Sequence, residues 1–154
     1  MNQGIHGIDL LQYLAGDVKK VQGTVRTLSH DIEVEDTAVA TVEFESGALG
    51  TILASTCAYP GFERKIEIIG DNGYAHIKEN RIVSLIINGV KQDVEIKHRI
   101  NTSADPRSLT HDAHKEQIEN FIGAIEGREE LLVDGYAGRK AVRVIEEIYK
   151  SSRA

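Results

Sequence analysis

The feature that most constrains the fold of this chain is a series of short segments in which polar and apolar residues alternate. Seven such segments lie between positions 18 and 98, and each has the period of two that is typical of a β-strand. Turn-forming pairs such as Ser46-Gly47 and Asn88-Gly89 separate several of them. Strands joined this closely run antiparallel, because parallel neighbours need a long crossover. The sequence therefore predicts an antiparallel meander of about seven strands.

Helical patterns lie on both sides of this meander. Before it, four apolar residues recur at helical spacing: Ile5, Ile8, Leu11 and Leu14. Gly16 is expected to end this helix, and two more helices are predicted over residues 108–127 and 134–152. The long irregular segment 98–111 is as typical of a plain connector as of a functional loop. We expect one α+β domain spanning residues 1–154, with the helices packed on one face of an open sheet.

The second face of that sheet needs a partner. Residues 37–58 carry small and branched apolar side chains on both faces. A sheet of this kind usually packs against something on each side, and a second copy of the chain is the simplest candidate. We therefore expect a homodimer or homotetramer that assembles through the open sheet face.

Composition excludes several classes of protein. The formal net charge is −6, which argues against a nucleic-acid binder, since such proteins usually carry a basic face. The apolar runs are too short to span a bilayer, so no membrane partner is expected. The lone cysteine, Cys57, excludes an internal disulfide and a zinc site built from cysteines. A reducing cytoplasm is the simplest compartment.

The opening helix carries a polar stripe opposite its apolar one. Asn2, His6, Asp9 and Tyr13 fall on one side of it at about 100° per residue. This stripe is a candidate catalytic and substrate-binding surface, in which the glycines beside His6 would leave room for a ligand. A purely structural role is the alternative, with Asn2 as an N-cap and His6 as an ordinary exposed residue.

A second polar cluster lies at the start of the penultimate helix. His111 and His114 are three residues apart, with Asp112 between them, and could share a metal ion. No third ligand is well placed, and the first turn of a helix also favours such residues. We expect no metal here.

The segments "NQGIHGIDLLQYLAG" and "HKEQIENFIGAIEGREELLVDGYAGRKAVRVIEEIYKSS", with strands between them, resemble the C-terminal domain of the Gfo/Idh/MocA oxidoreductases. The resemblance covers essentially the whole chain. It implies an NAD(P)-dependent enzyme acting on sugars, cyclitols or nucleotide sugars. The family carries an Asp-x-x-x-His pair at this position. The histidine of that pair matches His6, whereas this chain has Asn2 in place of the aspartate. Asparagine cannot accept a proton as a carboxylate does, so His6 is the expected proton-transferring group.

The same resemblance shows what the sequence lacks. It has no Gly-x-Gly-x-x-Gly turn after a strand and no Glu-Lys-Pro segment with the family's catalytic lysine. The dinucleotide-binding domain and the first strand of the second domain are thus expected to be missing. NAD or NADP would serve the full-length parent, and the fragment alone is expected to bind no cofactor and to be inactive. The Asn-Gln pair favours a nucleotide-sugar substrate over an inositol.

Two other interpretations stay open. One is a stand-alone domain that binds a sugar or serves in assembly without catalysis. The other is a small metal hydrolase, which requires four side chains to converge: His6, Asp9, His111 and His114.

Overall fold

The structure is a computed structural model that describes residues 4–79, 81–94 and 112–153. Its three helices are α1 (Gly4–Ala15), α2 (Asp112–Ile125) and α3 (Gly135–Arg153). Its strands are β1 (Val18–Arg26), β2 (Thr37–Phe44), β3 (Leu49–Ser55), β4 (Lys65–Gly70), β5 (Gly73–Lys78), β6 (Arg81–Ile87) and β7 (Val90–Lys91). All the strand pairs in these ranges are antiparallel, so the predicted α+β class and meander are confirmed.

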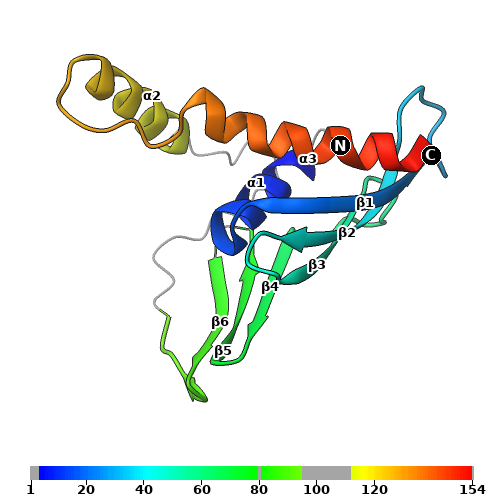
Figure 1. The fold of residues 1–154 in the computed structure, drawn as a ribbon, viewed down its shortest axis with the longest axis horizontal. Coiled ribbons are helices and arrows are strands. Elements are labelled where there is room, and N and C mark those ends of the chain that lie inside the picture. The colour runs from blue at the N-terminus through cyan, green and yellow to red at the C-terminus, as the bar shows by residue number, and fades with distance from the viewer. Residues whose placement is uncertain (1–3, 80, 95–111, 154) are drawn as a thin grey trace.

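The strands form two sheets where we expected one. One sheet has the order β1-β2-β3 and the other the order β4-β5-β6-β7 (Figure 1). Tight turns join the strands from β4 to β7, whereas residues 56–64 separate β3 from β4. A connection of that length does not force its two strands to pair, so the meander can break there.

Element bounds differ from the expected ones mainly at the last strand of the second sheet. α1 ends at Ala15, and the Gly16 N–H donates to the Gln12 carbonyl at 2.9 Å, as the predicted glycine stop requires. β7 has two residues, far fewer than the predicted strand over 90–98, whose last four residues lie outside the described ranges. The predicted loop 98–111 lies outside them as well.

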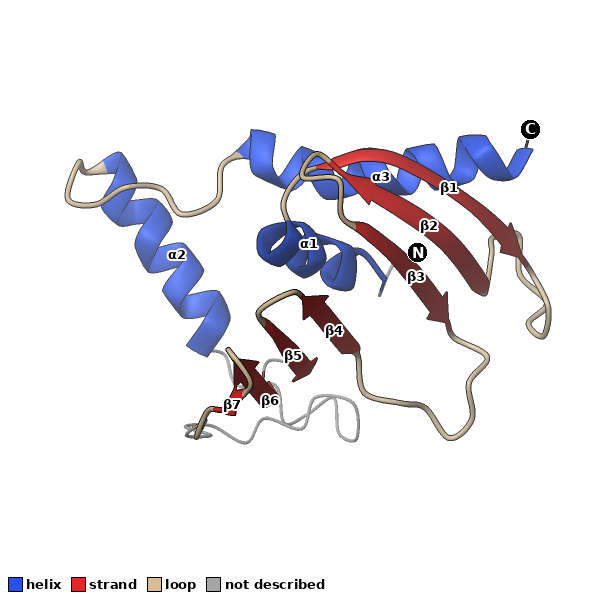
Figure 2. Ribbon diagram, turned by 60° about the horizontal axis from the view of Figure 1, so that its bottom comes forward, coloured by secondary structure: helices blue, strands red, loops and turns tan. Residues whose placement is uncertain are grey.

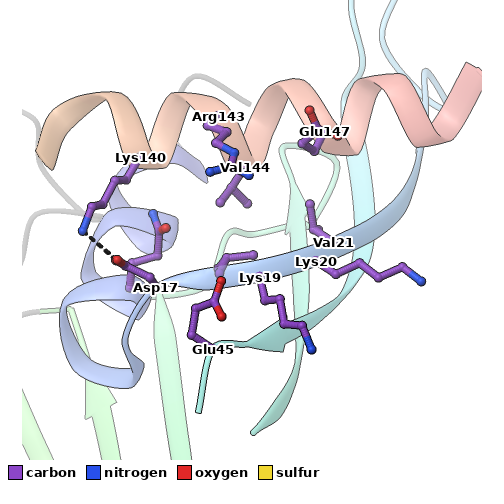
Figure 3. A pocket seen from close by; sticks show the side chains of 11 residues that line it. Asp17, Lys19, Lys20, Val21, Glu45, Lys140, Arg143, Val144 and Glu147 are labelled. Carbon is purple, nitrogen blue, oxygen red and sulfur yellow. Dashed lines mark hydrogen bonds and ion pairs between the residues drawn. The ribbon is translucent and has the colours of Figure 1, made fainter. Parts of the chain in front are cut away.

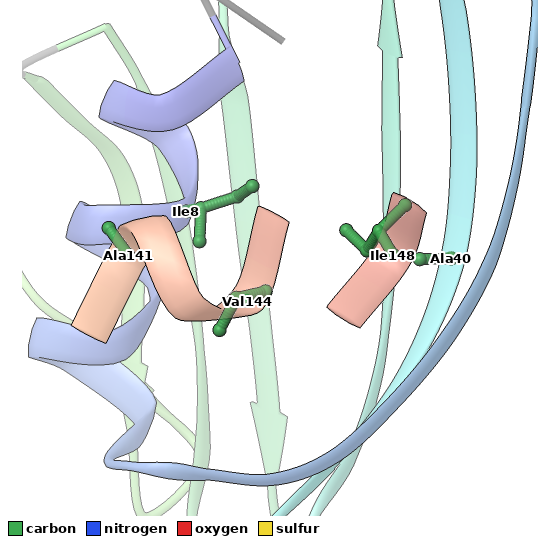
Figure 4. Close-up of a cluster of buried hydrophobic side chains, with 5 residues drawn as sticks. All are labelled: Ile8, Ala40, Ala141, Val144 and Ile148. Atoms are coloured by element: carbon green, nitrogen blue, oxygen red, sulfur yellow. The ribbon is translucent and has the colours of Figure 1, made fainter. Parts of the chain in front are cut away.

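The main core lies between α3, α1 and the three-stranded sheet. Five buried residues form it: Ile8, Ala40, Ala141, Val144 and Ile148 (Figure 4). The α3 members are three and four residues apart and therefore share one face of the helix. The alanine on β2 leaves room for α3 to approach the sheet closely. Ile148 is 0% exposed, which makes it the centre of this packing.

α3 also covers one edge of the three-stranded sheet, the outer edge of β1. The backbone N–H groups of Gly23 and Val25 donate to the hydroxyl oxygens of Ser151 and Ser152 at 2.9 and 3.0 Å. An uncovered edge strand invites pairing with another chain, so these two hydroxyl groups shield β1.

α2 stands away from both sheets, which corrects the expectation that all helices pack on one sheet face (Figure 2). The side chain of Asn120 on α2 is buried instead against the loop that follows the helix. The Asn120 amide donates there to the Glu129 carboxylate and to the Glu130 carbonyl, both at 2.9 Å. The apolar stripe of α2 stays largely exposed: Ile118, Phe121, Ile122 and Ile125. None of the described helices combines the length and apolar character needed to cross a membrane.

Candidate functional site

α1 turns one polar side to solvent and packs its opposite side into the core. His6, Asp9 and Tyr13 are all exposed, Tyr13 to 86%. Ile8 between them is 2% exposed. The three polar residues therefore lie on a side of the helix that a ligand or another domain can reach. Asn2, the fourth residue of the predicted stripe, lies outside the described residues.

Arg64, which the sequence did not single out, lies against this helix. A Cβ atom added at Gly7 would stand 3.4 Å from Cδ of Arg64, an ordinary van der Waals distance. The room that we expected beside His6 is thus bordered, on the Gly7 side, by the aliphatic part of Arg64. No sequence pattern connects the two residues, because only the packing of α1 on the start of β4 brings them together.

Glu79, in the turn between β5 and β6, fixes Arg64 in this position. The Arg64 backbone N–H donates to Glu79 Oε1 at 3.0 Å, and Nη2 donates to the Glu79 carbonyl at 3.1 Å. The Glu79 N–H donates in turn to the Arg64 carbonyl at 2.9 Å. The Arg64 side chain is 27% exposed, so a partly buried positive charge lies beside the polar helix.

The residues of the metal-hydrolase interpretation do not converge within the described ranges. His6 and Asp9 lie on α1, and His114 is an exposed residue of α2. Of the residues that the structure describes, none of these three belongs to a group of possible metal ligands. His111 lies outside the described ranges, and nothing is described of the Asp112 side chain.

A groove of about 260 Å³ lies between the end of α1, the start of β1 and α3 (Figure 3). Its lining mixes charges of both signs: Asp17, Lys19, Lys20, Glu45, Lys140, Arg143 and Glu147. Lys140 Nζ donates to both carboxylate oxygens of Asp17, at 2.7 and 2.9 Å. His6, Asp9 and Tyr13 do not line this groove, and it lacks the largely apolar lining of most small-molecule sites.

The chain is similar in sequence and in fold to known oxidoreductases. Residues 1–76 match the model of the GFO/IDH/MocA C-terminal domain. The crystal structure of the WlbA dehydrogenase from Bordetella pertussis, in complex with NADH and UDP-GlcNAcA, superposes with a TM-score of 0.76. It is 30% identical, and the match covers 99% of this chain and 42% of that one. Residues 1–76 of the chain are thus similar to the C-terminal domain of the Gfo/Idh/MocA family.

Two curated oxidoreductases are also similar to most of the chain. An uncharacterized oxidoreductase of Bacillus subtilis, YrbE, is 28% identical over 94% of this chain and 42% of its own length. Myo-inositol 2-dehydrogenase of Thermotoga maritima is 25% identical over 92% of this chain and 43% of its own. The chain therefore spans somewhat less than half the length of the relatives it matches. The predicted Gfo/Idh/MocA resemblance is confirmed.

Proposed function

We propose that this chain is the substrate-binding and oligomerisation domain of an NAD(P)-dependent dehydrogenase or reductase that acts on a sugar or nucleotide sugar. The similarity to WlbA over nearly the whole chain carries this proposal, because that enzyme is known in complex with NADH and UDP-GlcNAcA. The similarity to an inositol dehydrogenase makes a cyclitol a second possible type of substrate. The Asn-Gln pair before His6 favours the nucleotide sugar.

His6 is the proposed proton-transferring group. Oxidation of a secondary alcohol removes a proton from the hydroxyl oxygen and a hydride from the carbon that bears it. A neutral imidazole accepts that proton near neutral pH, and its exposure on α1 lets a substrate hydroxyl reach it. Asp9 and Tyr13 lie on the same exposed side of α1. Together with Asn2 they are assigned to hydrogen bonds with substrate hydroxyl groups, and the Asn2 amide cannot act as a base.

The described residues do not fit a dinucleotide. Their strand pairs are all antiparallel, and the sequence has no glycine-rich turn between a strand and a helix. In enzymes of this kind the nicotinamide ring accepts or supplies the hydride. We assign its binding to a part of the enzyme other than the described residues.

The outer face of the three-stranded sheet is the proposed assembly surface. Val39 on β2 and its register partner Leu53 on β3 are 50% and 76% exposed, and Leu49 on the same face is 82% exposed. α1 and α3 cover the other face. A second copy related by a two-fold axis would bury the same three residues on both sides.

Replacing His6 in the full-length enzyme tests the catalytic assignment. His6→Ala should lower kcat by about 10²–10⁴-fold, the usual cost of losing a general acid–base group, with a much smaller change in KM. His114→Ala is the matched control, since it removes an exposed histidine from α2. Near-normal turnover in His6→Ala would contradict the assignment.

Calorimetry of the 154-residue chain tests the cofactor assignment separately. Titration with NADH should give no binding heat at micromolar protein, because the chain lacks the phosphate-binding turn. A micromolar dissociation constant would mean that the chain itself holds the cofactor.

A further inference from the structure

Three side chains with metal-binding atoms meet at one end of the three-stranded sheet. His30 lies in the loop between β1 and β2, Asp36 precedes β2, and Cys57 follows β3. One ligand atom from each lies within 4.8 Å of the others. This group is the only one of its kind among the described residues, and it involves neither α1 nor the proposed substrate surface.

The group converges on a single atom. Nδ1 of His30 lies 3.3 Å from Oδ2 of Asp36 and 3.8 Å from Sγ of Cys57. In a catalytic Cys-His-Asp relay the thiol and the carboxylate contact opposite nitrogens of the imidazole ring. Here the thiol and the carboxylate approach the same nitrogen, Nδ1. This arrangement is unsuitable for a proton relay, whereas three atoms this close together could all bind one metal ion.

Two of the three separations between the ligand atoms fit tetrahedral zinc. Zinc binds imidazole nitrogen and carboxylate oxygen at about 2.0–2.2 Å and thiolate sulfur at about 2.3 Å. At a tetrahedral angle these bond lengths separate nitrogen from oxygen by roughly 3.4 Å and nitrogen from sulfur by roughly 3.6 Å. The corresponding separations of 3.3 and 3.8 Å require only small movements to admit the ion.

Asp36 is held in place before any ion arrives. Its buried carboxylate accepts backbone N–H groups from Leu28, Ser29 and His30 at 2.8–3.0 Å. These bonds, the one from Ser29 above all, hold the pKa of the carboxyl well below its usual range although burial by itself raises it. The contact with the His30 ring, at 3.3 Å, is longer than each of these backbone bonds, so an ion would enter between the carboxylate and the ring. Ligands fixed by such outer hydrogen bonds are usual at metal sites.

Cys57 supplies the soft ligand. Its sulfur is half-buried and, besides His30, contacts the Thr37 hydroxyl at 3.6 Å and the Asp36 carbonyl at 3.8 Å. A divalent cation would offset the negative charges that a thiolate and a carboxylate ligand bring to one site. Thiolate with imidazole selects zinc over magnesium or calcium.

We propose that His30, Asp36 and Cys57 bind a zinc ion through Nδ1, one carboxylate oxygen and Sγ. The His30 side chain is 47% exposed, which provides the entry path and leaves the fourth position to water. The ion joins the β1–β2 loop to the end of β3. The sequence excluded a site of several cysteines but did not predict this mixed one, because its ligands are 6 and 21 residues apart.

Cobalt substitution tests the site directly. The reduced, untagged, metal-free chain is titrated with Co²⁺ and then with Zn²⁺ as competitor. We expect the visible absorption of tetrahedral cobalt together with a near-ultraviolet thiolate-to-cobalt charge-transfer band, both lost when zinc is added. Cys57→Ser should lose the charge-transfer band, and His30→Gln should weaken binding at least about tenfold. Both variants leave the Asp36 carboxylate and its backbone bonds in place.

His114→Gln is the matched control and should bind cobalt as the unmodified chain does. Zinc should also raise the melting temperature of the unmodified chain and of His114→Gln, but not that of Cys57→Ser. The proposal is overturned if stoichiometric cobalt gives no charge-transfer band. It is equally overturned if Cys57→Ser and His30→Gln bind with unchanged affinity, since the ion would then sit elsewhere on the surface.

Discussion

Tyr149 anchors α3 to the loop between β1 and β2. Its hydroxyl donates to Oε1 of Glu35 at 2.7 Å, and burial, together with this carboxylate, raises the pKa of Tyr149 to about 12. The unfolded chain releases the phenol proton near pH 10, whereas the folded chain retains it. Stability from this contact is therefore complete below about pH 10 and is lost as the pH rises towards 12.

Tyr149→Phe tests this contact. The variant should lose about 1 kcal/mol of unfolding free energy at pH 8, the net value of one hydrogen bond. The difference from the unmodified chain should shrink between pH 10 and 12, as measured by urea unfolding. Tyr136→Phe is the control on the same helix, since Tyr136 is 76% exposed. A difference that does not depend on pH would show that only packing was lost.

Gly23 shows how closely one helix and one strand approach. A Cβ atom at this position would lie 2.8 Å from the Val39 carbonyl oxygen and 3.0 Å from Cγ2 of Ile148. Gly23→Ala should therefore cost about 1–3 kcal/mol of stability, as overpacking usually does. Gly138→Ala on α3 is the opposite case, because nothing lies within 4 Å and the helix gains up to about 1 kcal/mol. Thermal unfolding of both variants gives the signs, and a stable Gly23→Ala would mean that α3 can move away from β1.

Elements were predictable where local chemistry decides them. The turn at Asn88-Gly89 and the helix end at Gly16 follow from the backbone conformations that these residues favour. The short turns predict that the strands they join are antiparallel. The break between β3 and β4 and the outward position of α2 depend on contacts between distant segments. The same is true of the candidate sites. The exposed side of α1 followed from helical spacing, whereas Arg64 against Gly7 and the His30-Asp36-Cys57 group have no local signature.

At the scale of the whole molecule, the proposed dimer interface on the outer face of the three-stranded sheet can be tested. Leu53→Glu would place a charge in the proposed interface, next to Val39, and should weaken dimerisation by at least about tenfold if Leu53 is a central contact. Leu132→Glu is the control, since Leu132 is 81% exposed but lies outside the sheets. Sedimentation at low micromolar concentration measures both. If the unmodified chain sediments as a 17.0 kDa monomer, the open sheet face is no interface in this chain.

The hydroxyl groups that α3 places along the edge of β1 also bear on the order of folding. Gly23 and Ser151 are 128 positions apart in a chain of 154 residues. Their contact has a high contact order, and chains dominated by such contacts fold slowly because a long loop must close first. On the ribosome, β1 leaves the exit tunnel long before α3 has been made. The sheet must therefore spend much of its synthesis with β1 unshielded, the stage at which a chaperone that binds exposed strand edges would protect it best.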